Sequence, residues 1–392
     1  MSDRARLAAY LAHRQGLLGP KASLSPAEVL ERFGWARTVG GANPYLTAFS
    51  RAGIRREEVD QALADRLVEE VPSARSCTYL LPAAEVWIGL RAAEGGSIAE
   101  QRRGEKVGIT ADETEALCRA VISALEAGPL APRGLRAVLG DQVRSLGEAG
   151  KKQGLSTNLP LALGKLQEEG KIGRVPLDGR LDNERYSYRL WVGSPLDSAP
   201  DRDEAFRRLA VRYWDWIGFS SLAHFRWFTG LGVKAALGAT EGLGLVEARD
   251  DGLLATPATI EEFGDFRAPD EPDCRLVASM DSIFLLRREV VSFFGDGELG
   301  RYEALSGRGM ASGGLADLEY NAILDRGTIV GLWEFDPDEG KIVYSAWGGA
   351  ATSISEAVEA TEEMIRDDLG DCRSFSLDSP KSRKPRLDAL RG

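Results

Sequence analysis

The sequence is poor in the residues that build metal sites and disulfide frameworks. Its 392 residues include only four cysteines and two histidines, namely Cys77, Cys118, Cys274, Cys372, His13 and His224. The cysteines are scattered, which excludes a CxxC metal motif and is typical of free thiols in a reducing compartment. Two histidines give a zinc ion too few ligands. We therefore predict no metal ion and no other cofactor.

Long apolar runs are also missing. No stretch of eighteen consecutive apolar residues occurs, so the sequence predicts no transmembrane helix. The N-terminal stretch MSDRARLAAYLAHRQGLL carries charges throughout, which excludes the uninterrupted apolar core of a signal peptide. These two absences predict a cytoplasmic protein.

The charge balance leans to the acidic side. The chain has 60 acidic and 49 basic side chains, a net charge of −11. Affinity for nucleic acid comes largely from lysines and arginines that neutralise phosphates, so a polyanionic partner requires these residues to gather on one surface. A hydrophobic content of 43% is enough for packed cores. The length favours about two to four packed units.

The clearest unit lies at residues 105–193. Thr110 and Glu113 form a capping box, and a helical apolar stripe through Leu117, Val121 and Leu125 follows. Two shorter helices and a hairpin come next, with a polar turn at 147–154 between the helices. Three helices followed by a β-hairpin make a winged helix. The later segments are helices 132–139 and 157–169 and strands 171–176 and 186–191.

The same order of elements recurs on both sides of this unit. Residues 1–95 contain a capping box from Ser25 to Glu28. A helix over 56–64 and extended stretches at 67–71 and 77–81 follow it. Residues 203–258 come after a linker rich in Pro, Ser and Asp, and predict three helices and a short wing. Those helices span 204–216, 222–228 and 233–239, and the wing spans 245–255. We interpret the three copies as tandem winged-helix domains.

The rest of the chain has a different pattern. Residues 270–376 contain strand-like stretches and a closing helix over 354–369. The stretches are 275–286, 320–325, 328–335 and 341–347. Residues 377–392 hold a cluster of basic residues and two prolines and are predicted to be a disordered basic tail. The predicted fold class is α+β, with tandem winged-helix (helix–turn–helix) units packed around a small β-rich C-terminal domain.

Five phrases spread along the chain are together specific to one protein family. They are Ala42–Leu46 running into Phe49–Arg51, Arg75–Leu80, Phe206–Tyr213, Asp281 ahead of Arg287-Arg288, and Asp325–Gly327. In order and spacing they resemble the AlkZ/YcaQ family of bacterial crosslink-repair DNA glycosylases over nearly the whole chain. The resemblance implies three winged helices around a small β-rich domain, with double-stranded DNA, alkylated or not, as the partner. We expect a monomer that associates with the nucleoid when it binds DNA.

The site region departs from that family. The resemblance implies a catalytic Gln-x-Gln or Gln-x-Asp pair, and counting back from Pro44 without a gap places Arg37-Thr38-Val39 there. A family Arg-Gly-Thr-x-His phrase keeps its arginine as Arg75 but has Tyr79 in place of the histidine. Excision of an N-alkylated purine needs acceptors that stabilise an oxocarbenium-like sugar and hold a water. Val39 has no acceptor, and Arg37 would place a cation beside a developing cation.

Three functions follow from these observations. The first is a DNA-binding member of the DNA glycosylase-like superfamily that lacks the usual catalytic pair and acts in damage recognition or regulation, not as an enzyme. The second is an active glycosylase that removes bulky N-alkylated purines with a relocated catalytic residue, for which Asp281 is the candidate. The third is a scaffold for proteins or small molecules that kept the fold without the DNA, which the net charge supports.

The candidate DNA contacts are mainly basic and polar side chains. Arg37 and Arg75 are interpreted either as phosphate contacts or as solvated arginines. The start of the helix over 157–169 can meet phosphates or base edges, although such helices also pack against neighbours. The full set is Arg37, Asn43, Arg75, Lys151, Lys152, Thr157, Asn158, Lys165, Arg287 and Arg288. The aromatic residues between 213 and 228 are expected to be core, with His224 as a structural histidine beside them.

Overall fold

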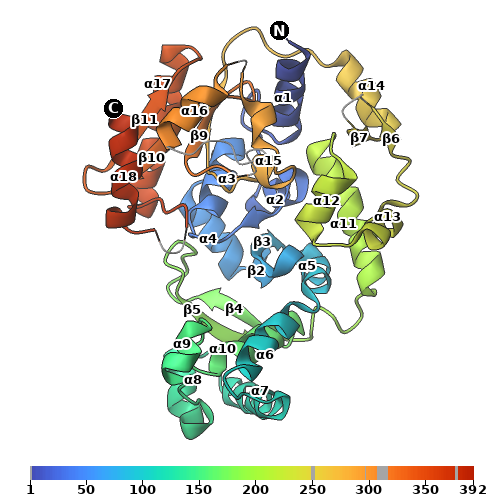
Figure 1. Cartoon of the computed structure of the whole chain (residues 1–392), viewed down its shortest axis with the longest axis vertical. Coiled ribbons are helices and arrows are strands. Elements are labelled where there is room, and N and C mark those ends of the chain that lie inside the picture. Colours follow the sequence, from blue (N-terminus) through green and yellow to red (C-terminus); the bar gives the residue numbers. More distant parts are fainter. Residues whose placement is uncertain (1, 249–251, 296, 307–316, 376–377) are drawn as a thin grey trace. The chain divides into compact units, whose positions relative to one another are not determined.

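The computed structural model describes residues 2–248, 252–295, 297–306, 317–375 and 378–392. The chain divides into two compact units, one formed by Met1–Val68 with Arg207–Gly392 and the other by Glu69–Phe206 (Figure 1). The division falls inside the first and third winged helices expected from the sequence. Within the described residues, no helix is long and apolar enough to cross a bilayer.

The Glu69–Phe206 unit begins with a hairpin and two helices. Strand β2 (Val68–Pro72) pairs with β3 (Thr78–Pro82). Helices α5 (Val86–Ala93) and α6 (Gly96–Glu105) follow, and the sequence did not predict them. Glu168 accepts hydrogen bonds from the backbone N–H groups of Gly95 and Ser97, both at 2.6 Å, and so fixes the start of α6.

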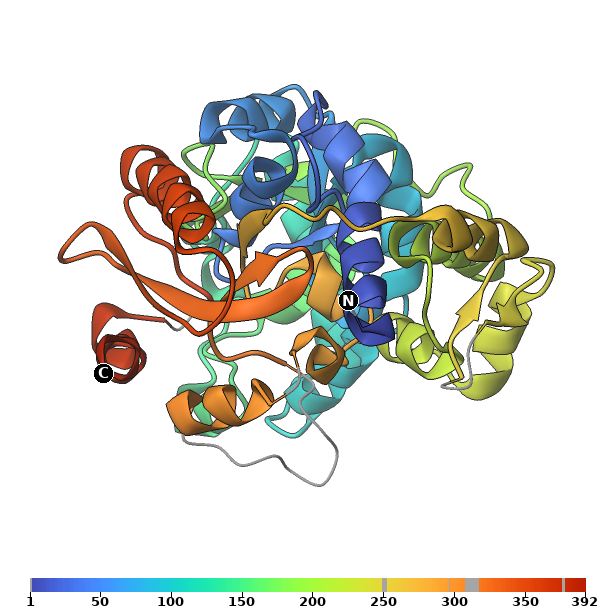
Figure 2. The ribbon, with the colours of Figure 1, turned by 90° about the horizontal axis from the view of Figure 1, so that it is seen from above.

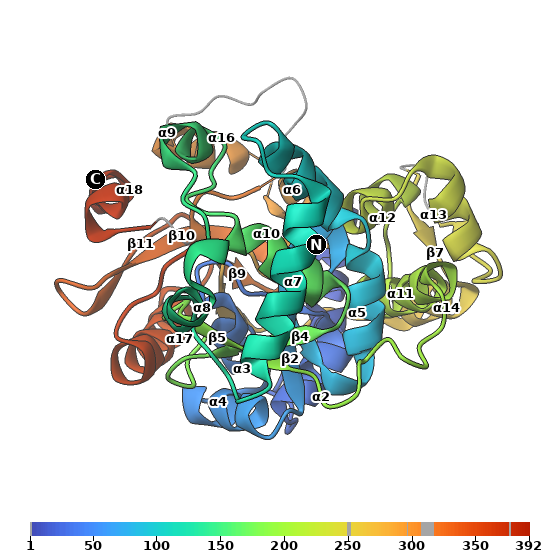
Figure 3. The same ribbon diagram turned by 90° about the horizontal axis from the view of Figure 1, so that it is seen from below.

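Three helices and a hairpin of this unit share one core. Leu117, Val121 and Leu125 of the first helix pack against leucines of the other two helices. Thr110 caps the first helix by accepting from the Glu113 N–H at 3.1 Å, as the capping box predicted. Figure 3 looks onto these elements, which are α7 (Ala111–Leu125), α8 (Pro132–Leu139), α10 (Leu159–Glu168), β4 (Ile172–Pro176) and β5 (Tyr186–Leu190). The expected polar turn at 147–154 is instead mostly helical, as α9 (Gly147–Lys152).

The other unit opens with four helices, of which two match the sequence prediction closely. Helix α2 is capped by Ser25, whose N–H donates to Glu28 at 2.8 Å in the expected capping box. Helix α3 was not predicted, because polar and apolar residues are buried alike along it and leave no distinct apolar stripe. The helices are α1 (Asp3–Arg14), α2 (Pro26–Phe33), α3 (Asn43–Ala52) and α4 (Arg56–Ala64).

A second group of helices follows from residue 202. Tyr213 and Phe225 are fully buried with ring centroids 5.1 Å apart, so the aromatic residues form core as predicted. His224 beside them is half-buried, and burial together with Arg287 lowers its pKa to about 4. The elements are α11 (Arg202–Ile217), α12 (Leu222–Thr229), α13 (Val233–Thr240), the paired strands β6 (Val246–Glu247) and β7 (Leu254–Ala255), and α14 (Pro257–Asp265).

A four-stranded antiparallel sheet forms the C-terminal part of the same unit, in the order β11-β10-β9-β8. Its strands are β8 (Cys274–Val277), β9 (Asn321–Asp325), β10 (Thr328–Asp336) and β11 (Lys341–Ala346). Helix α17 (Ala351–Met364), extended by a π-helical turn (Ile365–Leu369), packs against β8 and β11, and α18 (Pro380–Arg391) packs against β10 and β11. Figure 2 shows α17 and α18 on opposite sides of the sheet.

Two expectations for this region were wrong. Residues 275–286 do not form one strand, because Asp281 accepts a hydrogen bond from the Ile283 N–H and starts the short helix α15 (Ser282–Leu285). The tail at 377–392 is not disordered, since residues 380–391 form α18 with Arg383 and Leu387 buried. A further helix, α16 (Leu299–Ser306), precedes β9.

Candidate functional site

The segment that corresponds to the family motif is a tight turn between β1 (Ala36–Arg37) and α3. The Gly41 N–H donates to the Thr38 carbonyl at 2.9 Å, and Gly40, at the third position, has a φ of +84°. This left-handed conformation at the third position is what a type II turn requires. Gly40 also has no room for a side chain, because a Cβ there would lie 2.8 Å from the Arg373 carbonyl oxygen.

Arg37 stands at the start of this turn. Its carbonyl accepts a hydrogen bond from Asn43 Nδ2 at 2.8 Å, which ties the turn to the first residue of α3. Among the described residues, nothing forms an ion pair or a hydrogen bond with its guanidinium, and its Nε is buried. A half-buried cation without an internal anion is available to an external one.

Two buried oxygens lie one helical turn apart on α3. Asn43 Oδ1 and Thr47 Oγ1 are both buried and have no hydrogen-bond partner in the structure. Residues four apart share a helix face, so both point from the same side of α3. Buried polar atoms are nearly always hydrogen-bonded, so these two oxygens are acceptors that a bound water could satisfy.

The same face of α3 continues to a buried ion pair at its other end. Arg51 is fully buried, and its Nη1 and Nη2 donate to Asp281 at 2.8 and 2.7 Å. Nη2 also donates to Ser282 at 3.1 Å. Gln15 completes the cluster, accepting from the Ser282 hydroxyl at 2.7 Å. Bidentate geometry with additional hydrogen bonds is what makes an internal ion pair tolerable.

Asp281 is therefore placed away from the Arg37 turn. Eight residues separate Asn43 from Arg51, which is about 12 Å along a helix. Both carboxylate oxygens of Asp281 bind Arg51, and one also caps α15. In this position the carboxylate holds helices together.

Arg75 lies in the other unit, at the tip of the β2–β3 hairpin. It is exposed, and both it and Ser76 have left-handed backbone angles, with φ of 57° and 56°. The turn is closed by the Ser73 N–H, which donates to the Cys77 carbonyl at 2.8 Å. Two successive non-glycine residues in this region are strained, and such strain concentrates at functional sites.

The remaining candidates of this unit differ in their exposure and in whether their side chains have partners inside the protein. Lys151 and Lys152 are exposed on α9, with Lys151 paired to Glu148 at 2.7 Å. Asn158 and Lys165 have internal partners instead. Asn158 is buried and accepts from the Arg144 N–H at 2.9 Å, and Lys165 binds Glu115 and Glu169 at 3.1 and 2.5 Å. These two carboxylates raise the pKa of Lys165. Between these groups, Thr157 is half-buried and its hydroxyl has no described partner.

Arg287 and Arg288 differ from each other although they are adjacent. Arg287 is buried and binds Glu289 at 2.6 Å. Arg288 is half-buried, binds Asp317 at 2.9 Å and lies 4.5 Å from the ring centre of Trp227. Only Arg288 is therefore accessible, and its charge is already paired.

No group of three or more metal-ligating side chains occurs within the described ranges. Thr47 was not among the residues singled out from the sequence, and Arg51 was named only as part of a family phrase and not as a buried partner of Asp281. The spacing of Asn43, Thr47 and Arg51 at four-residue intervals was readable as one helix face, but a polar face gives no hydrophobic periodicity.

Comparisons with known proteins bear on the family and the fold of the chain. A search of curated proteins gives no match. The solved structure of Streptomyces sahachiroi DNA glycosylase AlkZ is similar, with a TM-score of 0.70 and 18% identity over 95% of this chain and 98% of that chain. The model of the DNA glycosylase AlkZ-like family matches residues 35–367. By this match over most of its length, the chain belongs to the AlkZ-like DNA glycosylase family.

Proposed function

We propose that this chain binds double-stranded DNA at the Arg37 turn and does not excise bases with a Gln-x-Gln or Gln-x-Asp pair. The solved AlkZ structure is that of a DNA glycosylase, and family membership favours DNA as the partner here. Arg37-Thr38-Val39 stands at the family's motif position by ungapped counting.

The observation that carries the proposal is the state of Arg37. Other arginines of the same unit have carboxylate partners, such as Arg51 with Asp281 at 2.7 Å and Arg55 with Asp368 at 2.8 Å. The Arg37 guanidinium has no such partner within the described residues. A phosphate of the duplex backbone would supply the missing anion with charge-assisted hydrogen bonds.

The arrangement of α7, α8, α10 and the β4–β5 hairpin supports a second element of the proposal. Three helices and a hairpin around one core are what a winged helix requires. We infer that this unit is a winged helix whose third helix, α10, uses Asn158 and Lys165 internally. Its DNA contacts would then come from exposed groups such as Arg75 and Lys152.

The test is binding to duplexes with and without an N7-alkylated purine, measured over a range of salt. Arg37→Ala should weaken binding about ten-fold and reduce the salt slope by about 0.9, because one phosphate contact is lost. Arg32→Ala is the matched control, since it removes the same charge from an exposed position on the preceding helix. Absence of binding at low salt would contradict the proposal and favour a scaffold without DNA.

One observation favours a second candidate, an active glycosylase. Asn43 Oδ1 and Thr47 Oγ1 are buried and unpartnered, and two such oxygens are suited to hold an attacking water. Thr47→Val removes one oxygen while preserving the shape of the side chain. If the protein releases N7-alkylated bases and this variant does not, catalysis has moved to α3. If Asp281→Asn alone abolishes release from a folded protein, Asp281 is the relocated residue. The leading proposal expects no release by the natural sequence.

A further inference from the structure

The turn that carries Arg37 is in contact with the C-terminal part of its unit. A Cβ on Gly40 would lie 2.8 Å from the Arg373 carbonyl oxygen and 3.0 Å from the Phe375 nitrogen. Backbone atoms of residues 373–375 therefore form a wall directly against Gly40. The position of this wall decides where the turn can lie.

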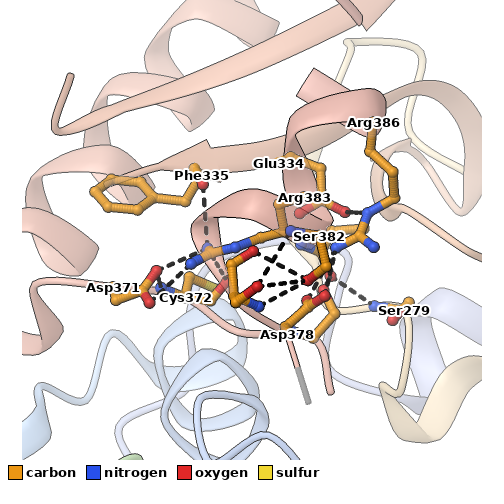
Figure 4. Close-up of polar contacts among 12 residues, drawn as sticks. Ser279, Glu334, Phe335, Asp371, Cys372, Asp378, Ser382, Arg383 and Arg386 are labelled. Atoms are coloured by element: carbon orange, nitrogen blue, oxygen red, sulfur yellow. Dashed lines mark hydrogen bonds and ion pairs between the residues drawn. The ribbon is translucent and has the colours of Figure 1, made fainter. Parts of the chain in front are cut away.

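Residues 371–375 are themselves held by a fully buried arginine of α18. Arg383 donates to both oxygens of Asp371, at 2.7 and 2.9 Å, and to the Cys372 carbonyl at 3.3 Å. It also donates to the Phe335 carbonyl of β10 at 3.3 Å. Figure 4 shows these bonds radiating from one guanidinium. Arg383 thus ties the wall to the sheet.

A second arginine of α18 makes a parallel connection. Arg386 donates from Nε to Glu334 of β10 at 2.9 Å and from Nη2 to Asp378 at 3.0 and 2.9 Å. Asp378 in turn accepts from the Ser374 N–H at 3.1 Å. The Ser374 hydroxyl reaches Asn321 of β9 at 3.4 Å. Each hydrogen bond that holds residues 371–375 in place therefore either involves a charged group or is buried.

We propose that residues 371–375 and 378–391 act as a clasp that positions the Thr38–Gly41 turn, with Arg383 and Arg386 as its positioning residues. In this proposal, no side chain of the clasp contacts the DNA. It limits the conformations of the turn and so preorganises Arg37 for its ligand, which lowers the entropy lost on binding. The effect on the turn is independent of DNA, whereas the effect on affinity rests on the function proposed above.

Hydrogen exchange of the full-length protein tests the clasp without DNA. In Arg383→Gln and Arg386→Gln, peptides covering residues 36–46 should exchange about ten-fold faster, while peptides of α7 and α10 should not change. Lys384→Gln is the matched control, because Lys384 lies on the same helix with 73% of its side chain exposed and only a 3.9 Å contact to Asp388. If α18 loosens and residues 36–46 keep their exchange rate, the proposal is overturned.

A reciprocal variant covers the case in which the arginine variants do not fold. Gly40→Ala places a methyl group against the wall and should speed exchange at residues 371–375. Gly53→Ala is its control, because Gly53 has a similar φ of +70° but its Cβ would meet only the end of Lys21 at 3.5 Å. Equal effects of the two substitutions on residues 371–375 would contradict the clasp.

Duplex binding then separates the clasp from the proposed function. Arg383→Gln should weaken binding in the natural sequence and have no further effect in an Arg37→Ala background. Non-additivity of this kind is not expected from a general loss of stability. Faster exchange at residues 36–46 with no DNA binding in any variant would support the clasp and refute the function. Additive effects on binding would refute the link between the clasp and Arg37.

Discussion

The two ends of α3 use arginine in opposite ways. At the C-terminal end, Arg51 is fully buried and bound to both oxygens of Asp281. On the other side, at the start of the turn that leads into α3, Arg37 has a guanidinium without an anion among the described residues. A buried charged side chain is tolerated only when it is paired. An arginine that is paired inside the protein is therefore not available to bind a ligand. The contrast assigns Arg51 to the maintenance of the fold, and it is consistent with the proposal that Arg37 binds a partner.

The strongest test of this contrast is Asp281→Ala. It leaves Arg51 buried without an anion and removes the cap of α15, so the free energy of unfolding should fall by about 3 to 5 kcal/mol. Urea unfolding followed by tryptophan fluorescence measures this change. The control is Asp367→Ala, whose pair with Arg366 is about half exposed and is worth no more than about 1 kcal/mol. A loss as small as the control's would refute the structural role of the pair.

A smaller effect on stability is expected from a substitution of Glu334, the side chain to which Arg386 donates. Burial raises its pKa to about 7. Between pH 4.5 and about 7, Glu334 is protonated in the folded protein but ionised in the unfolded chain. Its contribution to the free energy of unfolding therefore falls as the pH rises through that window. Glu334→Gln should remove this decline. The free energy of unfolding of the variant, minus that of the natural sequence, should therefore increase from pH 5 to pH 8.

Urea unfolding at a series of pH values measures the effect. Glu339→Gln is the control, because Glu339 binds Arg391 of the same helix from an exposed position, at 2.9 Å. A parallel shift of the Glu334→Gln curve at all pH values would show that the carboxyl does not titrate in this window.

The smallest effect on stability is expected for Arg37→Ala. Since the guanidinium has no partner to lose among the residues that the structure describes, the free energy of unfolding should change by no more than about 0.5 kcal/mol. The same urea experiment applies, with Arg51→Ala as the opposite extreme. A loss of more than about 2 kcal/mol for Arg37→Ala would mean that Arg37 is part of the fold, and the contrast between the two ends would be lost.

The sequence was most informative where a helix has an apolar face and a capping residue. Helix α7 was predicted with its N-cap Thr110 because leucine and valine recur at helical spacing. Helix α3 was missed because it turns Asn43, Thr47 and Arg51 inward. The partner of Arg51 lies 230 residues away, and no local pattern predicts such a contact.

Helix α18 was missed for the same physical reason. Its segment is basic and contains Pro385, a composition typical of a disordered tail. Arg383 is buried and Arg386 is half-buried because Asp371 pairs with the first and Asp378, together with Glu334, binds the second. In the candidate site, the sequence singled out Arg37 and Asn43 from their position. No local pattern showed that Lys165 has two carboxylate partners, whereas the Arg37 guanidinium has none within the described ranges.

The discontinuity of the first unit has a consequence for the order in which the protein is assembled during translation. Arg51 and Asp281 belong to one unit, yet all of Glu69–Phe206 lies between them. The ribosome therefore completes the inserted unit, which consists of consecutive residues, before α3 meets its buried counterion. Before Asp281 is synthesised, the Arg51 guanidinium must stay in contact with water, so the first unit cannot close around α3 at that stage.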